Sequence, residues 1–261
     1  MPDERAPLPV ADELTTKGHW ESAWAAPPRW KLPSPLFVTT RNMQRILRPA
    51  VRPGMRVLEL GCAPGKILAW VAARLDASVA GLDYSERGIT WARTLFDALH
   101  IPADLRCEDV FATTFAPASF DVVYSSGLIE HFDDPRAIVR THVSLVKPGG
   151  TAIIAIPDYG GIYGRLQRWL DPENLAIHNL RIMSRDALMQ LAPRDLSGAV
   201  RAYRAGRLSP WQLSLDRKLP APLGRAASYA LNGVGLLQPA DIGPLCPLLV
   251  VEITRRADSA C

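Results

Sequence analysis

The residues best suited to binding chemistry lie in two stretches, Val57–Lys66 (VLELGCAPGK) and Gly81–Ser85 (GLDYS). The first contains a turn with two glycines, Gly61 and Gly65, where a backbone without Cβ atoms can approach a ligand closely. The second contains Asp83, whose carboxylate can accept hydrogen bonds from two neighbouring hydroxyl groups. A glycine turn followed by an acidic residue at this spacing predicts a site for an adenosine-containing ligand.

The elements around this turn determine how it is held. Residues 56–60 form a short apolar run, which predicts a buried strand, and residues 67–75 carry apolar side chains at helical spacing. A second strand ends at Asp83, so the three elements make one βαβ unit. A dinucleotide-binding fingerprint would place glycine where this chain has Ala63 and Lys66. A lysine in that close helix–sheet contact argues against NAD or FAD.

Strands and helices continue to alternate beyond this unit. Short apolar runs predict further strands at residues 103–107, 120–124, 151–156, 198–205 and 246–253. The first five strands of the chain are separated by segments with helical spacing. This alternation predicts a parallel, doubly wound sheet with helices on both faces.

The chain is expected to divide into three parts. Residues 1–50 would form a polar tail and a helical cap with three tryptophans, residues 51–157 the ligand-binding core, and residues 158–261 the final strands with two insertions. The insertions, at 158–183 and 209–244, are long for a compact fold, and such segments are usually lids or binding loops. The cap and the insertions hold most of the aromatic residues outside the core strands, which favours an aromatic or apolar ligand.

Five motifs occur in the order and at the spacing of one known family. They are the glycine turn with its preceding acid (Glu59–Gly65), Asp83, Asp109 in CEDV, SSGLIEHFDDP after the fourth strand and LVKPGGTAIIAIP at the fifth. Through them the chain resembles the class I S-adenosylmethionine (SAM)-dependent methyltransferases, above all the small-molecule enzymes of ubiquinone and menaquinone biosynthesis. The resemblance implies an α/β, Rossmann-like fold with a doubly wound sheet of seven mostly parallel strands. It also implies SAM as the cofactor and S-adenosylhomocysteine as the product.

The resemblance assigns cofactor contacts to residues at the ends of the strands. Asp83 would accept hydrogen bonds from both ribose hydroxyls, and Tyr84 would lay its ring on the adenine. Asp109 would accept from the exocyclic amine of the adenine. The backbone amide of Val110 would donate to a ring nitrogen.

The methionine portion and the reaction involve other residues. Ser126 matches the family position whose backbone holds the methionine portion, and Glu59 would lie near the ammonium group. His131, just after the fourth strand, is the first candidate for a general base, and His178 is the second. The alternative for His131 is a histidine that only packs or hydrogen-bonds locally. Methyl transfer from a sulfonium is an in-line displacement, so positioning can supply most of the rate enhancement.

A bound metal is not expected. Some relatives hold a divalent ion through Glu-x-x-Glu-His after the fourth strand, but this chain has Gly127 in place of the first acid. The two remaining groups, Glu130 and His131, make a poor site for a hard cation. The four cysteines lack the spacing of a metal site and are expected to be reduced thiols in a cytoplasmic protein.

Composition and charge set the remaining expectations. The 261 residues are 48% hydrophobic and 21% charged with a net charge of +4, which is typical of a globular protein. The N-terminus lacks the apolar region of a signal peptide, and no apolar stretch is long enough to span a bilayer. We expect a cytoplasmic enzyme that methylates an oxygen or nitrogen of a small biosynthetic molecule, with no nucleic-acid partner and in a form compatible with a homodimer. The alternatives are an RNA-directed methyltransferase, which the basic C-terminal part slightly supports, and a catalytically silent SAM-fold binding protein.

Overall fold

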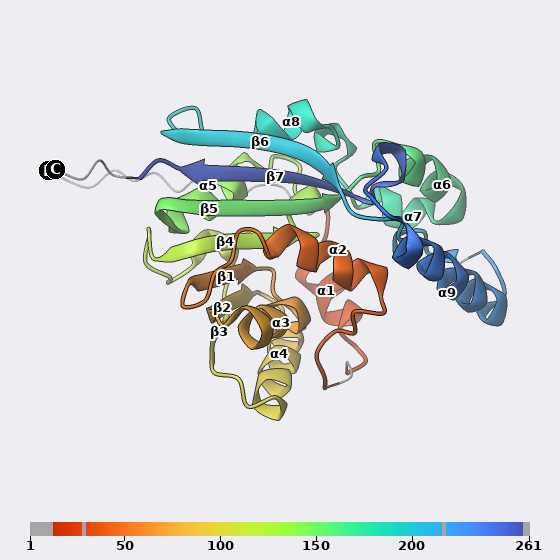
Figure 1. Ribbon diagram of the computed structural model, residues 1–261, viewed down its shortest axis with the longest axis horizontal. Helices are drawn as coiled ribbons and strands as arrows, with labels where there is room; N and C mark the ends of the chain where they lie inside the picture. Colours follow the sequence, from red (N-terminus) through yellow and green to blue (C-terminus); the bar gives the residue numbers. More distant parts are fainter. Residues whose placement is uncertain (1–12, 28–29, 216–217, 258–261) are drawn as a thin grey trace, which may run out of the picture.

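The strands form one twisted sheet in the order β3-β2-β1-β4-β5-β7-β6 (Figure 1). The computed structural model describes residues 13–27, 30–215 and 218–257. The strands are β1 (Arg56–Leu60), β2 (Ser78–Asp83), β3 (Ala103–Cys107), β4 (Phe120–Ser126), β5 (Val146–Pro157), β6 (Gly198–Ala205) and β7 (Leu248–Arg255). The helices are α1 (Lys17–Ala23), α2 (Val38–Leu47), α3 (Lys66–Leu75), α4 (Glu86–Ala98), α5 (Arg136–Leu145), α6 (Ile162–Leu170), α7 (Pro172–Ala176), α8 (Arg185–Met189) and α9 (Ala221–Leu237).

Strand direction follows the order of the chain. Strands β1 to β5 run parallel to one another, and β7 inserts antiparallel between β5 and β6. The predicted sheet of seven mostly parallel strands is therefore confirmed. The strand order reverses between β1 and β4, which is the point where open α/β sheets of this kind bind ligands.

Apolar residues on both faces of the sheet explain why helices cover each side. In β4, Val122 and Tyr124 point into one core layer, and Phe120 and Val123 point into the other. Helices α2, α3 and α4 cover the first face, whereas α5 and α8 cover the second (Figure 1). Because successive residues of a strand point to opposite faces, one apolar strand can serve two cores.

Helix α2 lies within the expected helical cap of residues 1–50, and α9 lies in the insertion at 209–244. The Asn232 side chain of α9 fixes the start of α2, because its Oδ1 accepts from the Val38 amide (2.9 Å) and its Nδ2 donates to the Leu36 carbonyl (2.8 Å). Gly235 of α9 packs directly against the Leu208 carbonyl. None of the helices in the described ranges combines the length and the apolar character needed to cross a membrane.

The two glycines of α9 provide a test of this packing. A Cβ atom at position 235 would lie 2.1 Å from the Leu208 carbonyl oxygen, whereas one at position 233 would meet nothing within 4 Å. We expect Gly235→Ala to lower the free energy of unfolding by about 1–3 kcal/mol through overpacking. Gly233→Ala should raise it by up to about 1 kcal/mol through helix propensity. Thermal unfolding of both variants measures this, and shifts of the same sign would contradict the packing of α9.

Candidate active site

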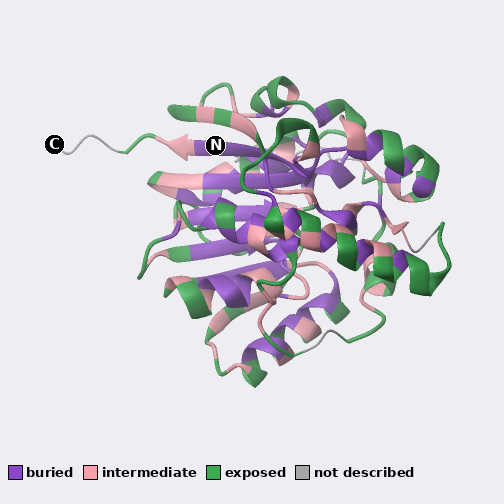
Figure 2. Ribbon diagram, turned by 45° about the vertical axis from the view of Figure 1, so that its right-hand side comes forward, coloured by how far each residue is buried: buried purple, intermediate pink, exposed green. Residues whose placement is uncertain are grey.

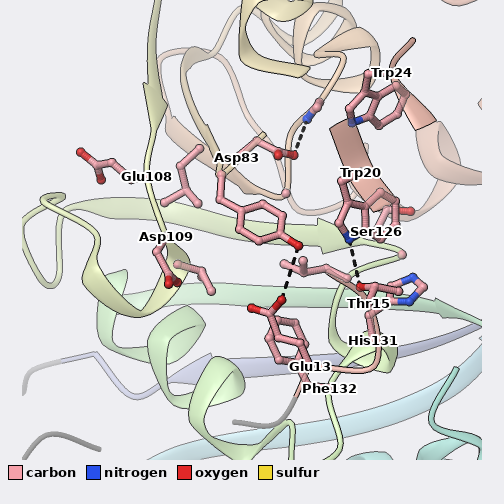
Figure 3. Close-up of a pocket in the computed structure, with 17 residues that line it drawn as sticks. Glu13, Thr15, Trp20, Trp24, Asp83, Glu108, Asp109, Ser126, His131 and Phe132 are labelled. Carbon is pink, nitrogen blue, oxygen red and sulfur yellow. Dashed lines mark hydrogen bonds between the residues drawn. The ribbon is translucent and has the colours of Figure 1, made fainter. Parts of the chain in front are cut away.

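A cavity lies at the carboxyl ends of β1, β2, β3 and β4, beside the reversal of strand order (Figure 3). It encloses about 830 Å³, including space that is open to solvent. Of the described residues that form its wall, all lie in the range 13–132, so the insertions after β5 do not contribute to it.

Asp83 holds the glycine turn in place. Its carboxylate oxygens accept hydrogen bonds from the backbone amides of Ala63 (3.1 Å) and Ser85 (2.9 Å). It thereby joins the turn after β1 to the start of α4, whose N-cap is Ser85. Burial raises the pKa of Asp83, and the two amide donors oppose that rise. Since each carboxylate oxygen has a second lone pair, Asp83 can also accept from the hydroxyls of a ligand.

The two glycines of the turn have different roles. Gly61 lines the cavity with φ of +70°, and a Cβ atom there would come within 3.1 Å of Leu128. Gly65 precedes α3 with φ of +82° and is not part of the wall. A Cβ atom at Gly65 would lie 3.1 Å from Ala92 and 3.2 Å from Phe96 of α4. Gly65 therefore allows close packing between the start of α3 and α4, and its contact with a ligand stays a prediction.

Tyr84 and Asp109 both line the cavity. The Tyr84 hydroxyl donates to the Glu13 carboxyl across 3.5 Å. Asp109 caps the short helix that begins at Val110, and it uses one oxygen to accept from the Phe111 amide (2.9 Å). Val110 lies beside it in the wall. The three residues assigned to adenine recognition are thus brought together.

The segment before and within α1 closes one side of the cavity. The Leu14 amide donates to the His131 carbonyl (2.7 Å), and the indole of Trp20 donates to the Thr15 hydroxyl (3.0 Å). Trp24 lines the wall, and its buried indole N–H has no hydrogen-bond partner among the described residues. This N–H is therefore an unsatisfied buried donor of a wall residue.

His131 is part of the wall and lies between two other rings. Its ring centroid is 5.0 Å from Trp20 and 4.7 Å from His178. Nδ1 donates to the Ile177 carbonyl (3.0 Å), so Nε2 carries the lone pair. Burial, and then the proximity of His178, lowers the pKa of His131 to about 3. The ring is therefore neutral at pH 7.

His178 lies behind His131 and is not part of the wall. Its Nδ1 donates to the Asn174 carbonyl (2.6 Å), and its ring meets that of Tyr159 edge-on at 5.0 Å. Burial lowers the pKa of His178. The structure therefore brings both predicted histidines together but gives only His131 access to a ligand in the cavity.

Glu130, His131 and His178 form a cluster that spacing along the chain did not reveal. One potential ligand atom from each lies within 4.8 Å of the others. The sequence-based argument against a metal counted two ligands, and His178 corrects that count to three. However, burial raises the pKa of Glu130 to about 8, so this carboxyl is protonated at pH 7. Two imidazole nitrogens and one carboxyl do not suit a hard, oxygen-seeking cation, and the absence of a metal stays a prediction.

Ser126 and Glu59, the two residues assigned to the methionine portion, lie in different environments. Ser126, at the end of β4, lines the cavity. Glu59 instead lies buried in β1, outside the wall, where burial raises its pKa to about 8. The Tyr124 hydroxyl and the Leu68 amide oppose that rise. Its Oε2 has no hydrogen-bond partner among the described residues, and its placement near the ammonium group stays a prediction.

The charge of the wall favours a cationic ligand. It contains four carboxyl groups, those of Glu13, Asp83, Glu108 and Asp109, and neither lysine nor arginine occurs among the described wall residues. SAM carries both a sulfonium and an ammonium group, so its charge complements this wall. Glu13 and Glu108 were not predicted: Glu13 reaches the site only because the N-terminal segment crosses the loop after β4.

Comparison with known proteins agrees with this geometry. Residues 58–154 match the family described as Methyltransferase domain. This part of the chain therefore has the sequence pattern of a methyltransferase domain. A ubiquinone biosynthesis O-methyltransferase of Neisseria meningitidis is 42% identical to this chain over 100 residues, which are 37% of this chain and 42% of that protein. A protein of the same description from Chromobacterium violaceum is 29% identical over 223 residues, which cover 81% of this chain and 82% of that protein.

Solved structures share the fold of the methyltransferase domain. Phosphoethanolamine N-methyltransferase 2 of Haemonchus contortus superimposes with a TM-score of 0.58 at 15% identity, over 84% of this chain and 53% of that one. Geranyl diphosphate C-methyltransferase of Streptomyces coelicolor gives a TM-score of 0.56 at 16% identity, over 83% and 78% of the two chains. At these identities the likeness shows the fold alone.

The shifted pKa values of two buried acids and two buried histidines indicate how the stability of the fold depends on pH. Glu59 and Glu130 keep a proton up to about pH 8 in the folded state but lose it near 4.5 when unfolded, so their contribution falls as pH rises between these values. His131 and His142, with pKa values lowered from 6.5 to about 3 and 4, act in the opposite direction and lose their contribution as pH falls below 6.5. Stability should therefore decline above about pH 6.5 and below about pH 4.5.

Glu130→Gln isolates one of these groups, because it keeps the shape of the side chain and has no proton to lose. Between pH 6.5 and 8 its free energy of unfolding should fall by about 1–2 kcal/mol less than that of the parent protein. Urea unfolding at the two pH values measures this, with Glu173→Gln on exposed α7 as the control. Equal pH dependence in the parent and Glu130→Gln would show that Glu130 is ionised in the folded protein.

Proposed function

We propose that this protein is a SAM-dependent methyltransferase that transfers a methyl group to an oxygen atom of a small molecule. The observation that carries the proposal is the acidic cavity at the reversal of strand order, with His131 in its wall. The chain spans about two fifths of the length of the first relatives that it matches. The proposed activity and substrate therefore depend on this geometry together with the similarity.

The wall residues fit the parts of the cofactor. Asp83 has lone pairs for the ribose hydroxyls, Tyr84 offers a ring for the adenine, and Asp109 has a second oxygen for the amine. The Trp24 indole adds a donor with no other use among the described residues. When bound, SAM supplies an electrophilic methyl group on a good leaving group. The protein therefore needs to position the acceptor and to exclude water from it.

The low pKa of His131 restricts the acceptor. A neutral imidazole can accept a hydrogen bond from a hydroxyl and orient its oxygen. The hydroxyl proton becomes strongly acidic as its oxygen gains a methyl group, so even a weak base can take it at that stage. A primary ammonium with a pKa near 10 would instead have to lose its proton first, which a group of pKa about 3 does poorly. This difference favours oxygen over an alkylamine nitrogen.

The other two functions have less support. An RNA-directed enzyme needs cationic side chains along the path of the phosphates, and the described cavity wall has no lysine or arginine. A catalytically silent protein would not need a histidine lone pair in the wall beside the cofactor residues. The homodimer and the cytoplasmic location remain expectations from the sequence.

Asp83→Ala tests the cofactor assignment. Loss of the carboxylate should raise the dissociation constant for SAM at least about tenfold, because hydrogen bonds to a charged group contribute about 1.5–3 kcal/mol each. Calorimetric titration with SAM and with S-adenosylhomocysteine measures this. Asp104→Ala, an exposed aspartate on β3 that pairs with Arg106, is the matched control.

Because Asp83 also holds the glycine turn, Asp109→Ala provides a second test of SAM binding that leaves the turn intact. Thermal unfolding verifies that each variant is folded. Unchanged SAM affinity in both folded variants would mean that the cofactor lies elsewhere.

His131→Asn tests the proton acceptor. The amide of asparagine can keep the hydrogen bond to Ile177 but offers no imidazole lone pair. Turnover with a phenolic or alcoholic acceptor should fall at least about tenfold, while SAM affinity stays the same. His100→Asn, an exposed histidine after α4, is the control. Turnover equal to that of the control would reduce His131 to a packing residue.

A further inference from the structure

We propose that α9 and the chain just before α2 form a docking surface for an anionic lipid bilayer. The proposal concerns attachment to a membrane surface and does not depend on the proposed methyl transfer. It starts from the orientation of α9. The residues that this helix turns toward the protein are small or polar: Gly224, Ser228, Asn232 and Gly235.

The outward face of α9 is apolar, and Figure 2 turns this end of the molecule toward the viewer. Leu223 and Leu237 are 61% and 85% exposed. The Phe37 ring lies 6.4 Å from that of Tyr229, so the start of α2 extends the same surface. We call this surface the α9 patch, and it consists of six exposed residues: Leu36, Phe37, Leu223, Tyr229, Val234 and Leu237.

The way in which α9 packs against the protein keeps these residues exposed. An amphipathic helix on a globular protein normally buries its apolar stripe, whereas α9 buries the opposite face. The two hydrogen bonds of Asn232 to the chain around Leu36 and Val38 fix the rotation of α9. Gly235 fits against the Leu208 carbonyl, where any side chain would collide. Rotation of α9 to bury its leucines would break these contacts.

The charge around the α9 patch identifies its partner. Lys218 just before α9, Arg225 near its start and Arg41 of α2 form a basic rim. Asp241, the acidic residue that follows α9, is paired with Arg45. A second copy of the chain would bring two positive rims together, which is unfavourable. An anionic bilayer offers both an apolar interior for the leucines and negative headgroups for the rim.

The position of the α9 patch gives such docking a consequence. Helix α9 lies at the end of the molecule toward which the β4 and β5 arrows point (Figure 1). The cavity opens among the carboxyl ends of the same parallel strands. A protein bound through this patch would hold that end of its sheet close to the bilayer.

Vesicle flotation of the full chain tests the proposal. The full chain should bind vesicles of phosphatidylcholine with about 30% phosphatidylglycerol, and binding should weaken in pure phosphatidylcholine and at high salt. The double variant Leu223→Ser/Leu237→Ser should bind at least about tenfold more weakly, because two exposed leucines lose their apolar side chains. Met189→Ser, which removes an exposed apolar side chain from α8, should bind like the parent protein.

A second variant tests the charged rim without touching the apolar face. Lys218→Ala/Arg225→Ala should weaken binding by about fivefold for each charge removed. Absence of binding to the anionic vesicles, or equal binding by the leucine double variant, would overturn the proposal. A dimer that the leucine double variant dissociates, without vesicle binding by the parent protein, would also overturn it and assign the α9 patch to a second copy. None of these measurements involves methyl transfer, so their failure and that of the proposed function are distinguishable.

Discussion

The carboxylate of Asp83 is shared between architecture and ligand binding. It accepts from Ala63 in the turn after β1 and from Ser85 at the start of α4, so it joins the two crossovers that flank β2. The same oxygens face the cavity. The turn is consequently held in shape before any ligand arrives, and little conformational entropy has to be lost there on binding. A protein that used a separate residue for each task would need a second buried charge in the same space.

Burial separates the ionisable groups into two populations. The carboxyls of Glu59 and Glu130 behind the wall, and the ring of His131 in the wall, are neutral at pH 7 because desolvation penalises their charged forms. At the wall, Glu13 and Asp109 meet the cavity. A cationic ligand therefore meets negative charge at one surface, without ionised acids in the core that would lack partners. The low basicity of His131 follows from the same separation.

The sequence could predict those features that depend on local pattern. Periodicity placed the strands, and the position of Asp83, Tyr84 and Asp109 after strand ends was enough to bring them to one edge of the sheet. It could not predict contacts made by distant crossings, such as Glu13 against Tyr84 or His178 against His131. Motif position also did not reveal how Glu59 and Gly65 are packed. Glu59 is buried in β1, and Gly65 packs against the neighbouring helix α4.

The family match and the physical site have different extents. Residues 58–154 contain the motifs of the methyltransferase domain, but Glu13, Thr15, Trp20 and Trp24 in the wall precede it. Strand β7 pairs with the edge of β5 that would otherwise be open, and β7 begins almost a hundred residues after the family match ends. Residues 58–154 therefore do not form a complete site by themselves. Grafted alone into another protein, it would carry the recognition chemistry but would have an open cavity and an unpaired strand edge, which invites aggregation.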